Sequence, residues 1–377
     1  MRVRTPEDSG NADLVEITPG GEVSLRMRPD PSGHRQWFYV ELLDVKNQRI
    51  VVNILNAGEA SWPLGWEGFC AAVQDGGWPW ARADRTTYQD GVLRIEHTAT
   101  TDRLALATFA AYPITRHQAL IACAVASPRV RREVLGRTHD GRPMELLRLG
   151  RDDAEAPKVW IFARQHPGEV MAEWFMEGLL ARLADPEDEA VTRLLGQAAL
   201  RLLPNMNPDG SARGHHRVNA KGVDLNRAWA EPLDAPEVAV VRARMDQEGV
   251  AIALDVHGDE EVPFTYLISA HGAPRFDDAL AAEFSRFRAA WNEIDPLVSL
   301  KDGAPPLAPG EGHHGVSTKQ LATRFGALAV TVEMPYRSAP GEEFGPSHAK
   351  SLGESCVEAV LAALAAGRGV ASAHKAT

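Results

Sequence analysis

The sequence predicts an α/β protein built from two units that meet near residue 127. Three observations lead to this prediction. The chain has 377 residues, of which 44% are hydrophobic, enough for one large core or two ordinary ones. Residues before about 127 resemble short strands separated by turn residues, whereas later residues alternate strand-like and helix-like segments. We therefore expect a β-sandwich over residues 1–127 and an α/β unit with a largely parallel sheet over residues 128–377.

The first unit contains segments that are typical of strands, because they alternate or carry β-branched and aromatic residues between Gly, Pro, Asn and Asp. They are residues 23–27, 37–43, 50–55, 92–97 and 104–109. No good long helix interrupts them. Trp62, Trp66, Trp78 and Trp80 lie in the irregular middle of this unit. We interpret them as packing of the sandwich core rather than as a ligand surface.

The second unit alternates strands with helices of roughly 10 to 20 residues, which is typical of βαβ units whose sheet is covered on both faces. The expected strands are residues 158–163, 200–204, 250–256 and 327–334. The expected helices are residues 171–184, 235–245, 277–292 and 347–366. The sequence contains no internal repeat.

Composition excludes several classes of protein. There are 40 Lys and Arg against 51 Asp and Glu, a formal net charge of −11, whereas a nucleic-acid-binding surface needs clustered positive charge. Cys70, Cys123 and Cys356 form no CxxC pair, so we expect neither a disulfide framework nor a thiolate zinc cluster. The N-terminus lacks an apolar signal segment, and no stretch approaches the ~20 apolar residues of a membrane helix. These features predict a cytoplasmic protein without membrane or nucleic-acid partners.

Polar residues of the kinds that bind metals or act in catalysis follow several expected strands, at the edge where open α/β sheets bind ligands. The segments are residues 165–169, 207–210, 217–227 and 255–261, together with Glu333. His166 and Glu169 are separated by Pro-Gly, whose turn can aim an imidazole and a carboxylate at one point. His257, at the end of its strand, is the best candidate for a third ligand. Two His and one Glu leave the fourth position of a tetrahedral zinc open for water, which suits a catalytic site.

These residues also have ordinary structural interpretations. A His-x-x-Glu pair often arises by chance on a solvated surface, and Glu333 taken alone would be a surface charge at a strand end. His215 and His216 are either additional metal ligands or packing residues, and we favour the second because adjacent side chains point in different directions. The acidic run at residues 259–261 either binds a second cation or forms a charged loop rim, which is the simpler interpretation.

Five motifs occur in order along the chain: HPGE, NPDG, R-x-N-x-x-G-x-DLNR, DVHGDEE and a Glu within VTVEMP. In this order and spacing the chain resembles the zinc metallocarboxypeptidases, in particular the cytosolic carboxypeptidase branch that includes the deglutamylases. The resemblance covers residues 143–333, and the Trp-rich β region before them is similar to the N-terminal domain of that branch. It implies an α/β/α carboxypeptidase domain with a mixed, mainly parallel sheet, preceded by an N-terminal antiparallel β-sandwich.

The resemblance also implies how a metal is held and used. His166, Glu169 and His257 correspond to the zinc ligands, and Glu333 corresponds to the general base. One Zn²⁺ per chain is the implied cofactor. Elementary chemistry agrees, because two neutral imidazoles and one carboxylate leave zinc with a net positive charge that lowers the pKa of a bound water. A nearby carboxylate can accept that proton and pass it to the leaving amine.

According to the resemblance, residues 217–227 contain the groups that bind the substrate carboxylate and stabilise the oxyanion. A guanidinium presents a planar fork of donors that matches a carboxylate or a developing oxyanion. Arg217 corresponds to the residue that polarises the scissile carbonyl, and Asn226 and Arg227 correspond to those that bind the terminal carboxylate. Asp224 resembles the outer carboxylate that accepts the second ring N–H of a histidine ligand. Taken alone, Asp-Leu-Asn-Arg would be an ordinary helix cap or loop.

One expected feature of the substrate site is missing from the sequence. The pancreatic-type relatives close a tyrosine hydroxyl over the terminal carboxylate of the substrate. This chain has no Tyr between Tyr266 and Tyr336. The role is therefore vacant, or it is taken by His313, His314 or another residue that the sequence does not identify.

We therefore predict a zinc metallocarboxypeptidase that hydrolyses the C-terminal peptide bond of peptides or proteins. Alignment on Gly326 places Lys319 at the base of the side-chain pocket, where a basic residue favours C-terminal Glu or Asp; a solvated loop charge is the alternative. Two other functions remain open. One is a zinc amidase or deacylase of small N-acyl amino acids, and the other is a non-catalytic module that binds peptide C-termini. Glu333 argues against the module, because a binder needs no general base.

Overall fold

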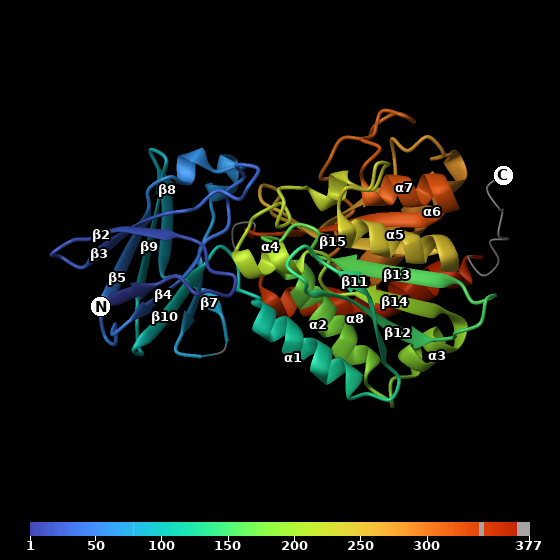
Figure 1. Ribbon diagram of the computed structural model, residues 1–377, viewed down its shortest axis with the longest axis horizontal. Coiled ribbons are helices and arrows are strands. Elements are labelled where there is room, and N and C mark those ends of the chain that lie inside the picture. Colours follow the sequence, from blue (N-terminus) through green and yellow to red (C-terminus); the bar gives the residue numbers. More distant parts are fainter. Residues whose placement is uncertain (78, 339–342, 368–377) are drawn as a thin grey trace.

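A computed structural model describes residues 1–77, 79–338 and 343–367. Two units lie end to end along the long axis of the molecule, with the strands of the first (blue) beside the larger helical and sheet unit (Figure 1). Trp78 lies outside the described residues. Among the described residues, no helix combines the length and the apolar character that spanning a bilayer requires.

The first unit contains two five-stranded sheets. One sheet has the order β1 (Arg2–Arg4), β4 (Tyr39–Leu43), β10 (Arg103–Ala107), β6 (Ala72–Asp75) and β7 (Ala81–Arg82). The other has the order β2 (Asp13–Ile17), β3 (Glu22–Arg26), β5 (Arg49–Ile54), β9 (Val92–Thr98) and β8 (Arg85–Gln89). All five strands expected from the sequence are present as β3, β4, β5, β9 and β10. Two 3₁₀ helices, η1 (Ala57–Glu59) and η2 (Pro63–Trp66), lie between β5 and β6.

The two sheets enclose one core, which makes the first unit a sandwich. Val23 and Leu25 of β3 pack in this core together with Val40 and Leu42 of β4. Strand pairs are antiparallel except β3 with β5, which are parallel because the chain crosses to the opposite sheet as β4 between them. The predicted antiparallel sandwich is confirmed apart from this one pair.

The sequence predicts that the tryptophans of the first unit pack its core, and the structure separates them. Trp66 is buried in the sandwich core. Trp80 packs partly buried against the larger core of the second unit, and its ring centroid is 6.3 Å from that of Tyr39. Trp62 faces the second unit, with its ring centroid 5.4 Å from that of His216. The interpretation as sandwich core is therefore confirmed for Trp66 and wrong for Trp80, which packs on the other core, and for Trp62, which lies at the contact between the units.

The second unit is built on a seven-stranded sheet. Its order is β11 (Arg131–Arg137), β12 (Pro143–Gly150), β14 (Ala199–Leu203), β13 (Lys158–Ala163), β15 (Ile252–Asp259), β17 (Leu328–Pro335) and β16 (Tyr266–Ser269). The four central strands β14, β13, β15 and β17 are mutually parallel, whereas β11, β12 and β16 pair antiparallel with their neighbours. This arrangement confirms the predicted α/β fold with a mixed sheet.

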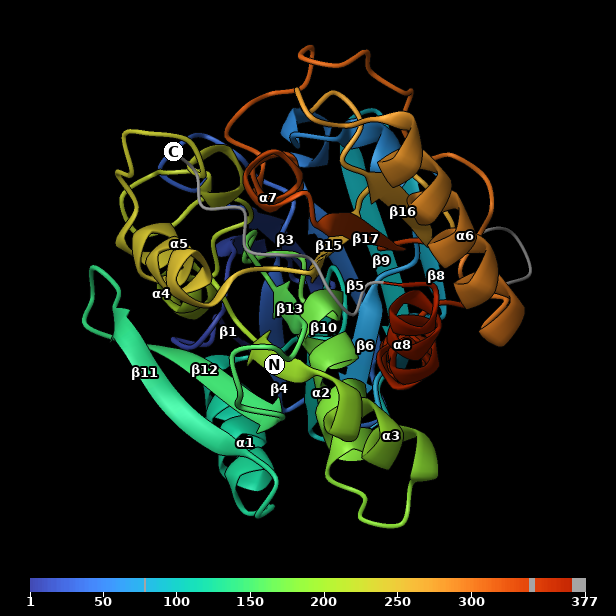
Figure 2. The same ribbon diagram turned by 90° about the vertical axis from the view of Figure 1, so that its right-hand side faces the viewer.

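Helices cover both faces of this sheet (Figure 2). One face carries α1 (Ile114–Val125), α2 (Met171–Leu183), α3 (Glu189–Gln197), α6 (Asp278–Ile294) and α8 (Pro346–Ala365). The other face carries α5 (Pro236–Glu248) and α7 (Ser317–Phe325). The short helices α4 (Pro208–Arg213) and η3 (Leu225–Arg227) lie in the connection between β14 and α5. The four helices expected from the sequence are present as α2, α5, α6 and α8.

Helix α1, which the sequence does not predict, connects the two units. Its first amides, from Ile114 and Thr115, donate to the carboxylate of Asp8 at 2.8 and 2.9 Å, so a residue of the first unit caps it. Its apolar face joins the core that contains both Trp174 of α2 and Phe109 of the sandwich. The division predicted at residue 127 falls after this helix, and we propose instead that the second unit begins near residue 113.

Candidate active site

The residues predicted for the site meet at the carboxyl edge of the parallel strands. Strand β13 ends at Ala163, and His166 and Glu169 follow in the turn that leads to α2. His257 lies on β15 and Glu333 on the adjacent strand β17. Because parallel strands present their carboxyl ends at one edge of the sheet, the topology brings these four side chains together.

The turn from His166 to Glu169 has room for only a glycine at position 168. A Cβ on Gly168 would collide with the ring of His216. The amide of Glu169 donates to the carbonyl of His166 at 3.2 Å, and α2 begins at Met171. This tight path turns the imidazole and the carboxylate toward one another.

His166, Glu169 and His257 form a compact buried cluster. Nδ1 of His166 lies 2.7 Å from Oε1 of Glu169, and Nδ1 of His257 lies 2.7 Å from Oε2 of the same carboxylate. One ligand atom from each residue lies within 4.8 Å of the others. In the part of the chain that the structure describes, this is the one such group of His, Cys, Asp and Glu side chains.

A carboxylate outside the cluster lies beside the Nε2 atom of each of the two histidines. Nε2 of His166 lies 3.0 Å from Oδ1 of Asp224, and Nε2 of His257 lies 2.8 Å from Oδ1 of Asp255. Such outer carboxylates fix the ring tautomer and leave Nδ1 to bind a metal. Asp224 is predicted from the sequence, whereas Asp255 is not. A signal was present, because Asp255 and His257 are two residues apart on one strand and so project from the same face.

The charges of the cluster suit a divalent cation. Burial by itself raises the pKa of the Glu169 carboxyl, but His166 and His257 hold that pKa well below its usual value. Burial likewise opposes ionisation of Asp224, yet His166 and Arg217 lower the pKa of its carboxyl. Two imidazole nitrogens and one ionised carboxylate, all buried and converging on one point, are a donor set that fits zinc.

Glu333 faces this cluster from the neighbouring strand. In the strand pairing it is opposite His257 of β15 on one side and Tyr266 of β16 on the other. Burial raises the pKa of the Glu333 carboxyl well above its usual value; His257 opposes this shift and the negative charge of Glu169 adds to it. A carboxylate that takes up a proton readily suits a group that must accept one from water.

Arg217 reaches the cluster from the loop after α4. Its Nε donates to Oδ2 of Asp224 at 2.8 Å, so one carboxylate links it to His166. Its guanidinium carbon lies 5.4 Å from the ring centroid of Trp62 in the sandwich. The two Nη atoms donate to no other residue that the structure describes, which leaves them available to a ligand.

Asn226 and Arg227 lie in η3, but their side chains differ in what they can offer a substrate. Asn226 is buried, with Oδ1 accepting the amide of Ser317 at 3.0 Å and Nδ2 lying 3.3 Å from Nε2 of His257. Arg227 is exposed, and Nη1 donates to the carbonyl of Asn226 at 2.8 Å. No described carboxylate pairs with Arg227, so most of its donors are free.

Lys319 lies in the first turn of α7, with its aliphatic stem against Gly312. The side chain is half-buried, and burial together with the charge of Arg227 lowers the pKa of the ammonium. Among the residues that the structure describes, no carboxylate pairs with it. A half-buried, unpaired cation next to a second cation favours the binding of an anion.

The loop before α7 lies against the Arg227 end of the site. Gly315 of this loop packs on the carbonyl of Arg227 so closely that a side chain there would not fit. His313 and His314 are exposed on the same loop. Tyr336 lies elsewhere, just beyond Glu333; it is buried, and its hydroxyl has no hydrogen-bond partner among the described residues. Which side chain closes over a substrate carboxylate stays a prediction.

His215 and His216 do not join the metal cluster. Nε2 of His216 lies 2.8 Å from Oε1 of Glu260, and both side chains are buried. Nδ1 of His215 lies 3.1 Å from the carbonyl of Val218. Both histidines contact other parts of the protein outside the cluster, which agrees with their interpretation as packing residues. The interpretation of residues 259–261 as a charged loop rim is wrong for Glu260, because that carboxylate is buried against His216.

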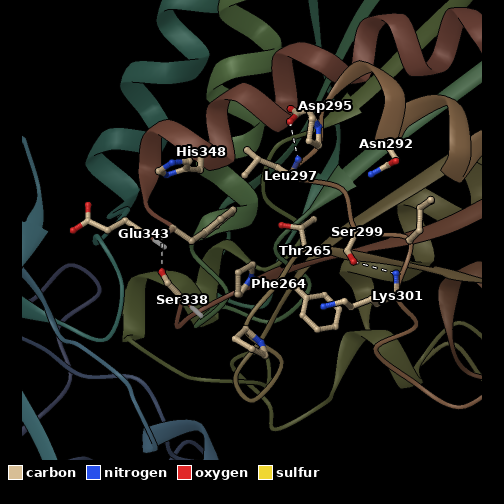
Figure 3. Close-up of a pocket in the computed structure, with 15 residues that line it drawn as sticks. Phe264, Thr265, Asn292, Asp295, Leu297, Ser299, Lys301, Ser338, Glu343 and His348 are labelled. Carbon is tan, nitrogen blue, oxygen red and sulfur yellow. Dashed lines mark hydrogen bonds between the residues drawn. The ribbon is translucent and has the colours of Figure 1, made fainter. Parts of the chain in front are cut away.

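A cavity of about 900 Å³ lies beyond the end of β17, separate from the cluster. It is lined by residues near the start of β16, the end of α6 and the start of α8, with Lys301 and Phe264 on one wall (Figure 3). Nζ of Lys301 lies 5.4 Å from the Phe264 ring centroid. None of the residues predicted for the site lines this cavity, so the cavity is not part of the predicted site.

Comparison with known families gives two separate matches along the chain. Residues 3–109 match the family model described as the cytosolic carboxypeptidase N-terminal domain. Residues 117–266 match the family model described as zinc carboxypeptidase. The second match contains the segment that carries the cluster, from His166 to His257.

Two solved structures are similar over nearly the whole chain, and a further relative is similar over three quarters of it. A metallo-carboxypeptidase from Burkholderia cenocepacia is 33% identical, with 97% of this chain and 99% of that one covered and a TM-score of 0.92. A metallo-carboxypeptidase from Pseudomonas aeruginosa is 34% identical, with 98% and 100% covered and a TM-score of 0.92. Cytosolic carboxypeptidase 6 from Caenorhabditis elegans is 28% identical over 75% of this chain and 67% of its own length. The chain therefore belongs to the zinc carboxypeptidases, a family of zinc-dependent peptidases, and to the branch that carries the cytosolic carboxypeptidase N-terminal domain.

Proposed function

We propose that this chain hydrolyses the C-terminal peptide bond of peptides or proteins with water activated by zinc, and that it prefers a C-terminal Glu or Asp. One observation carries the proposal: ligand atoms of His166, Glu169 and His257 converge within 4.8 Å, with Glu333 opposite His257 on the next strand. These three residues would hold a zinc ion, which when bound would lower the pKa of a water molecule and polarise the substrate carbonyl.

The proton is handled by Glu333. Its carboxylate accepts a proton from the attacking water and later donates it to the leaving amine. Burial favours this uptake, since it raises the pKa of the carboxyl. Asp224 and Asp255 hold the rings of His166 and His257 in orientation through their Nε2 atoms.

The substrate is held and polarised by two arginines. Arg217, anchored by Asp224, directs its free Nη atoms at the carbonyl oxygen and stabilises the negative charge that develops there. Arg227 has unpaired donors and binds the terminal carboxylate of the substrate, with Asn226 beside it. A peptide whose C-terminus is amidated lacks that carboxylate and should be a poor substrate.

The acidic preference rests on Lys319. Its ammonium, near Arg227 and without a described carboxylate partner, would pair with the side chain of a C-terminal Glu or Asp. The Pseudomonas aeruginosa relative is in complex with (2-guanidinoethylmercapto)succinic acid, a ligand with two carboxylates and a guanidinium. Since that guanidinium could instead stand for a basic side chain, C-terminal Arg and Lys belong in the test.

We also propose a cytoplasmic location. Its support is the matched N-terminal domain and the relatives that are named cytosolic carboxypeptidases. Fractionation of the source cells, with detection of the chain by antibody, tests this part. Recovery from an extracellular fraction would contradict it.

The experiment compares peptides that differ only in their C-terminal residue: Glu, Asp, Gln, Leu, Lys and Arg, with an amidated peptide as control. Zinc-loaded protein is incubated with each, and released amino acids are identified by mass spectrometry. Glu333→Gln is the matched inactive variant; it should keep zinc while turnover falls at least ~10²-fold. N-acyl amino acids are assayed alongside, and release from them but not from the peptides would indicate an amidase. Tight peptide binding without any release would indicate a non-catalytic module.

A further inference from the structure

The loop that carries Arg217 is held by the sandwich before it reaches the site. The amide of Ser9 donates to the carbonyl of Ala212 at 2.9 Å. Nδ2 of Asn11 donates to the carbonyl of Gly214 at 2.8 Å. The path of this loop therefore depends on a segment of the other unit, far away in sequence.

The backbone at Arg217 itself is held by Asp30 of the sandwich. Oδ2 of Asp30 accepts the amides of Arg217 and Val218 at 2.9 and 3.3 Å. Its Oδ1 accepts the amides of Ser32 and His34, each at 3.0 Å. Asp30 is buried, so loss of its carboxylate would leave several amides without an acceptor. One carboxylate thus joins a sandwich loop to the loop of Arg217.

The side chain of Arg217 is held by Trp62 of the sandwich. The guanidinium carbon lies 5.4 Å from the Trp62 ring centroid. The indole is itself fixed, because His34 stacks on it with centroids 5.6 Å apart and planes at 11°, and the ring of His216 lies 5.4 Å away. Attraction between a cation and an aromatic face grows as water is removed, and the Arg217 side chain is only 15% exposed.

We propose that Asp30 and Trp62 are positioning residues for Arg217, so that the sandwich completes the active site of the other unit. Asp30 fixes the backbone, Trp62 fixes the plane of the guanidinium, and Asp224 fixes Nε from within the second unit. An arginine that is free to rotate loses much of its side-chain entropy when it engages a ligand. Donors held in place before the reaction avoid that loss and stabilise developing charge more strongly.

This inference rests on the proposed role of Arg217 in hydrolysis. If Arg217 acts on charge that develops in the transition state, its positioning residues affect kcat rather than KM. A wall residue that only shapes the cleft would instead change KM. Measuring kcat and KM separately therefore distinguishes a positioning residue from a residue that only contacts the substrate.

The first experiment compares Trp62→Leu, Trp62→Phe and the control Leu64→Ala on one peptide substrate. Leu64 lies in the same segment and is 60% exposed, so its loss should change neither constant. Trp62→Leu should lower kcat roughly tenfold, the size of a partly desolvated cation–aromatic contact, with KM within about twofold. Trp62→Phe keeps an aromatic face and should retain most of kcat. Zinc content and thermal unfolding of all variants are measured alongside.

The second experiment is a double-mutant cycle with Arg217→Ala. If Trp62 acts through Arg217, Trp62→Leu should have no further effect on kcat in the Arg217→Ala background. Equal effects in both backgrounds would overturn the positioning proposal while leaving the proposed function intact. An Arg217→Ala protein with unchanged kcat would remove the proposed role of Arg217 and, with it, any group for Trp62 to position.

A third measurement needs no turnover. The Nε–H resonance of Arg217, identified by its loss in Arg217→Lys, reports how tightly the guanidinium is held. Its NMR order parameter should fall in Trp62→Leu and in Asp30→Ala, and it should stay near that of the parent protein in Trp62→Phe and Leu64→Ala. An order parameter unchanged in Trp62→Leu would overturn the proposal.

Discussion

His257 and Glu333 occupy opposite positions on the neighbouring parallel strands β15 and β17. The same register places Val256 opposite Val332, and both belong to the apolar core under α2 and α8. A slip of one residue would turn every side chain of a strand to the other face of the sheet. Burial of the valines therefore also sets the distance between Glu333 and the metal-binding cluster.

Replacing His166 and His257 together by alanine should abolish zinc binding, because a single carboxylate is left of the three converging ligands. Elemental analysis of the dialysed protein should fall from about one zinc per chain to near zero. His215→Ala, outside the cluster, is the control and should keep its zinc. The far-UV circular dichroism should be unchanged, since the sheet core is large enough to fold without the metal. Stoichiometric zinc in the double variant would disprove the ligand assignment.

Asp255→Asn should weaken zinc binding without removing a ligand. Oδ1 of Asp255 lies 2.8 Å from Nε2 of His257, and loss of such an outer carboxylate typically costs about 10- to 100-fold in metal affinity. Competition with a chromogenic chelator measures this affinity. Asp246→Asn, which removes a carboxylate near the surface at Arg324, is the matched control and should leave the affinity unchanged. Equal affinities for both variants would show that Asp255 does not support the ligand.

Lys319→Ala should erase most of the preference for acidic C-termini. A hydrogen bond to a charged group contributes roughly 1.5–3 kcal/mol, which corresponds to about a 10- to 150-fold preference in kcat/KM. Lys319→Glu should turn the preference toward Lys or Arg through the reversed charge. Lys301→Ala removes a lysine from the neighbouring cavity and serves as control. If the ratio of kcat/KM for the peptide ending in Glu to kcat/KM for the peptide ending in Gln is unchanged across the series, the determinant of the preference lies elsewhere.

His117 should make stability depend on pH. Burial by itself lowers the pKa of this imidazole, but the carboxylates of Glu173 and Glu145 raise it to about 9, above the unfolded value of 6.5. The stabilisation is therefore fully present below about pH 6.5 and is lost as pH rises through about 9, with an upper size of about 3 kcal/mol.

Urea unfolding of the parent protein and of His117→Gln at pH 6, 8 and 10 checks this prediction. The difference in the free energy of unfolding between the two proteins should be largest at pH 6 and should shrink toward pH 10. Arg116→Gln, one residue earlier on α1 and paired with Glu177, is the control for a general change in charge. A difference independent of pH would show that His117 is neutral in the folded protein.

Local patterns in the sequence determined the main elements. Each strand and helix that was predicted is present, because a period of two or 3.6 residues is a property of the segment itself. The chain also carries His166, Glu169, His257 and Glu333 at the ends of predicted parallel strands, and a parallel sheet gathers such ends at one edge. The topology of the sheet was enough to bring these residues together.

Only the tertiary structure decided which surfaces of the two units meet. Helix α1 depends on a cap from Asp8, and Trp62 turns outward to Arg217 although its neighbour Trp66 is buried in the sandwich. The partner of Asp30 lies almost 190 positions away in the chain, since its carboxylate accepts the amide of Arg217. The sequence around a side chain gives the size and polarity of that side chain, but it does not show which distant residues the side chain contacts. Those neighbours are set by how the apolar faces of the two units pack into a shared core.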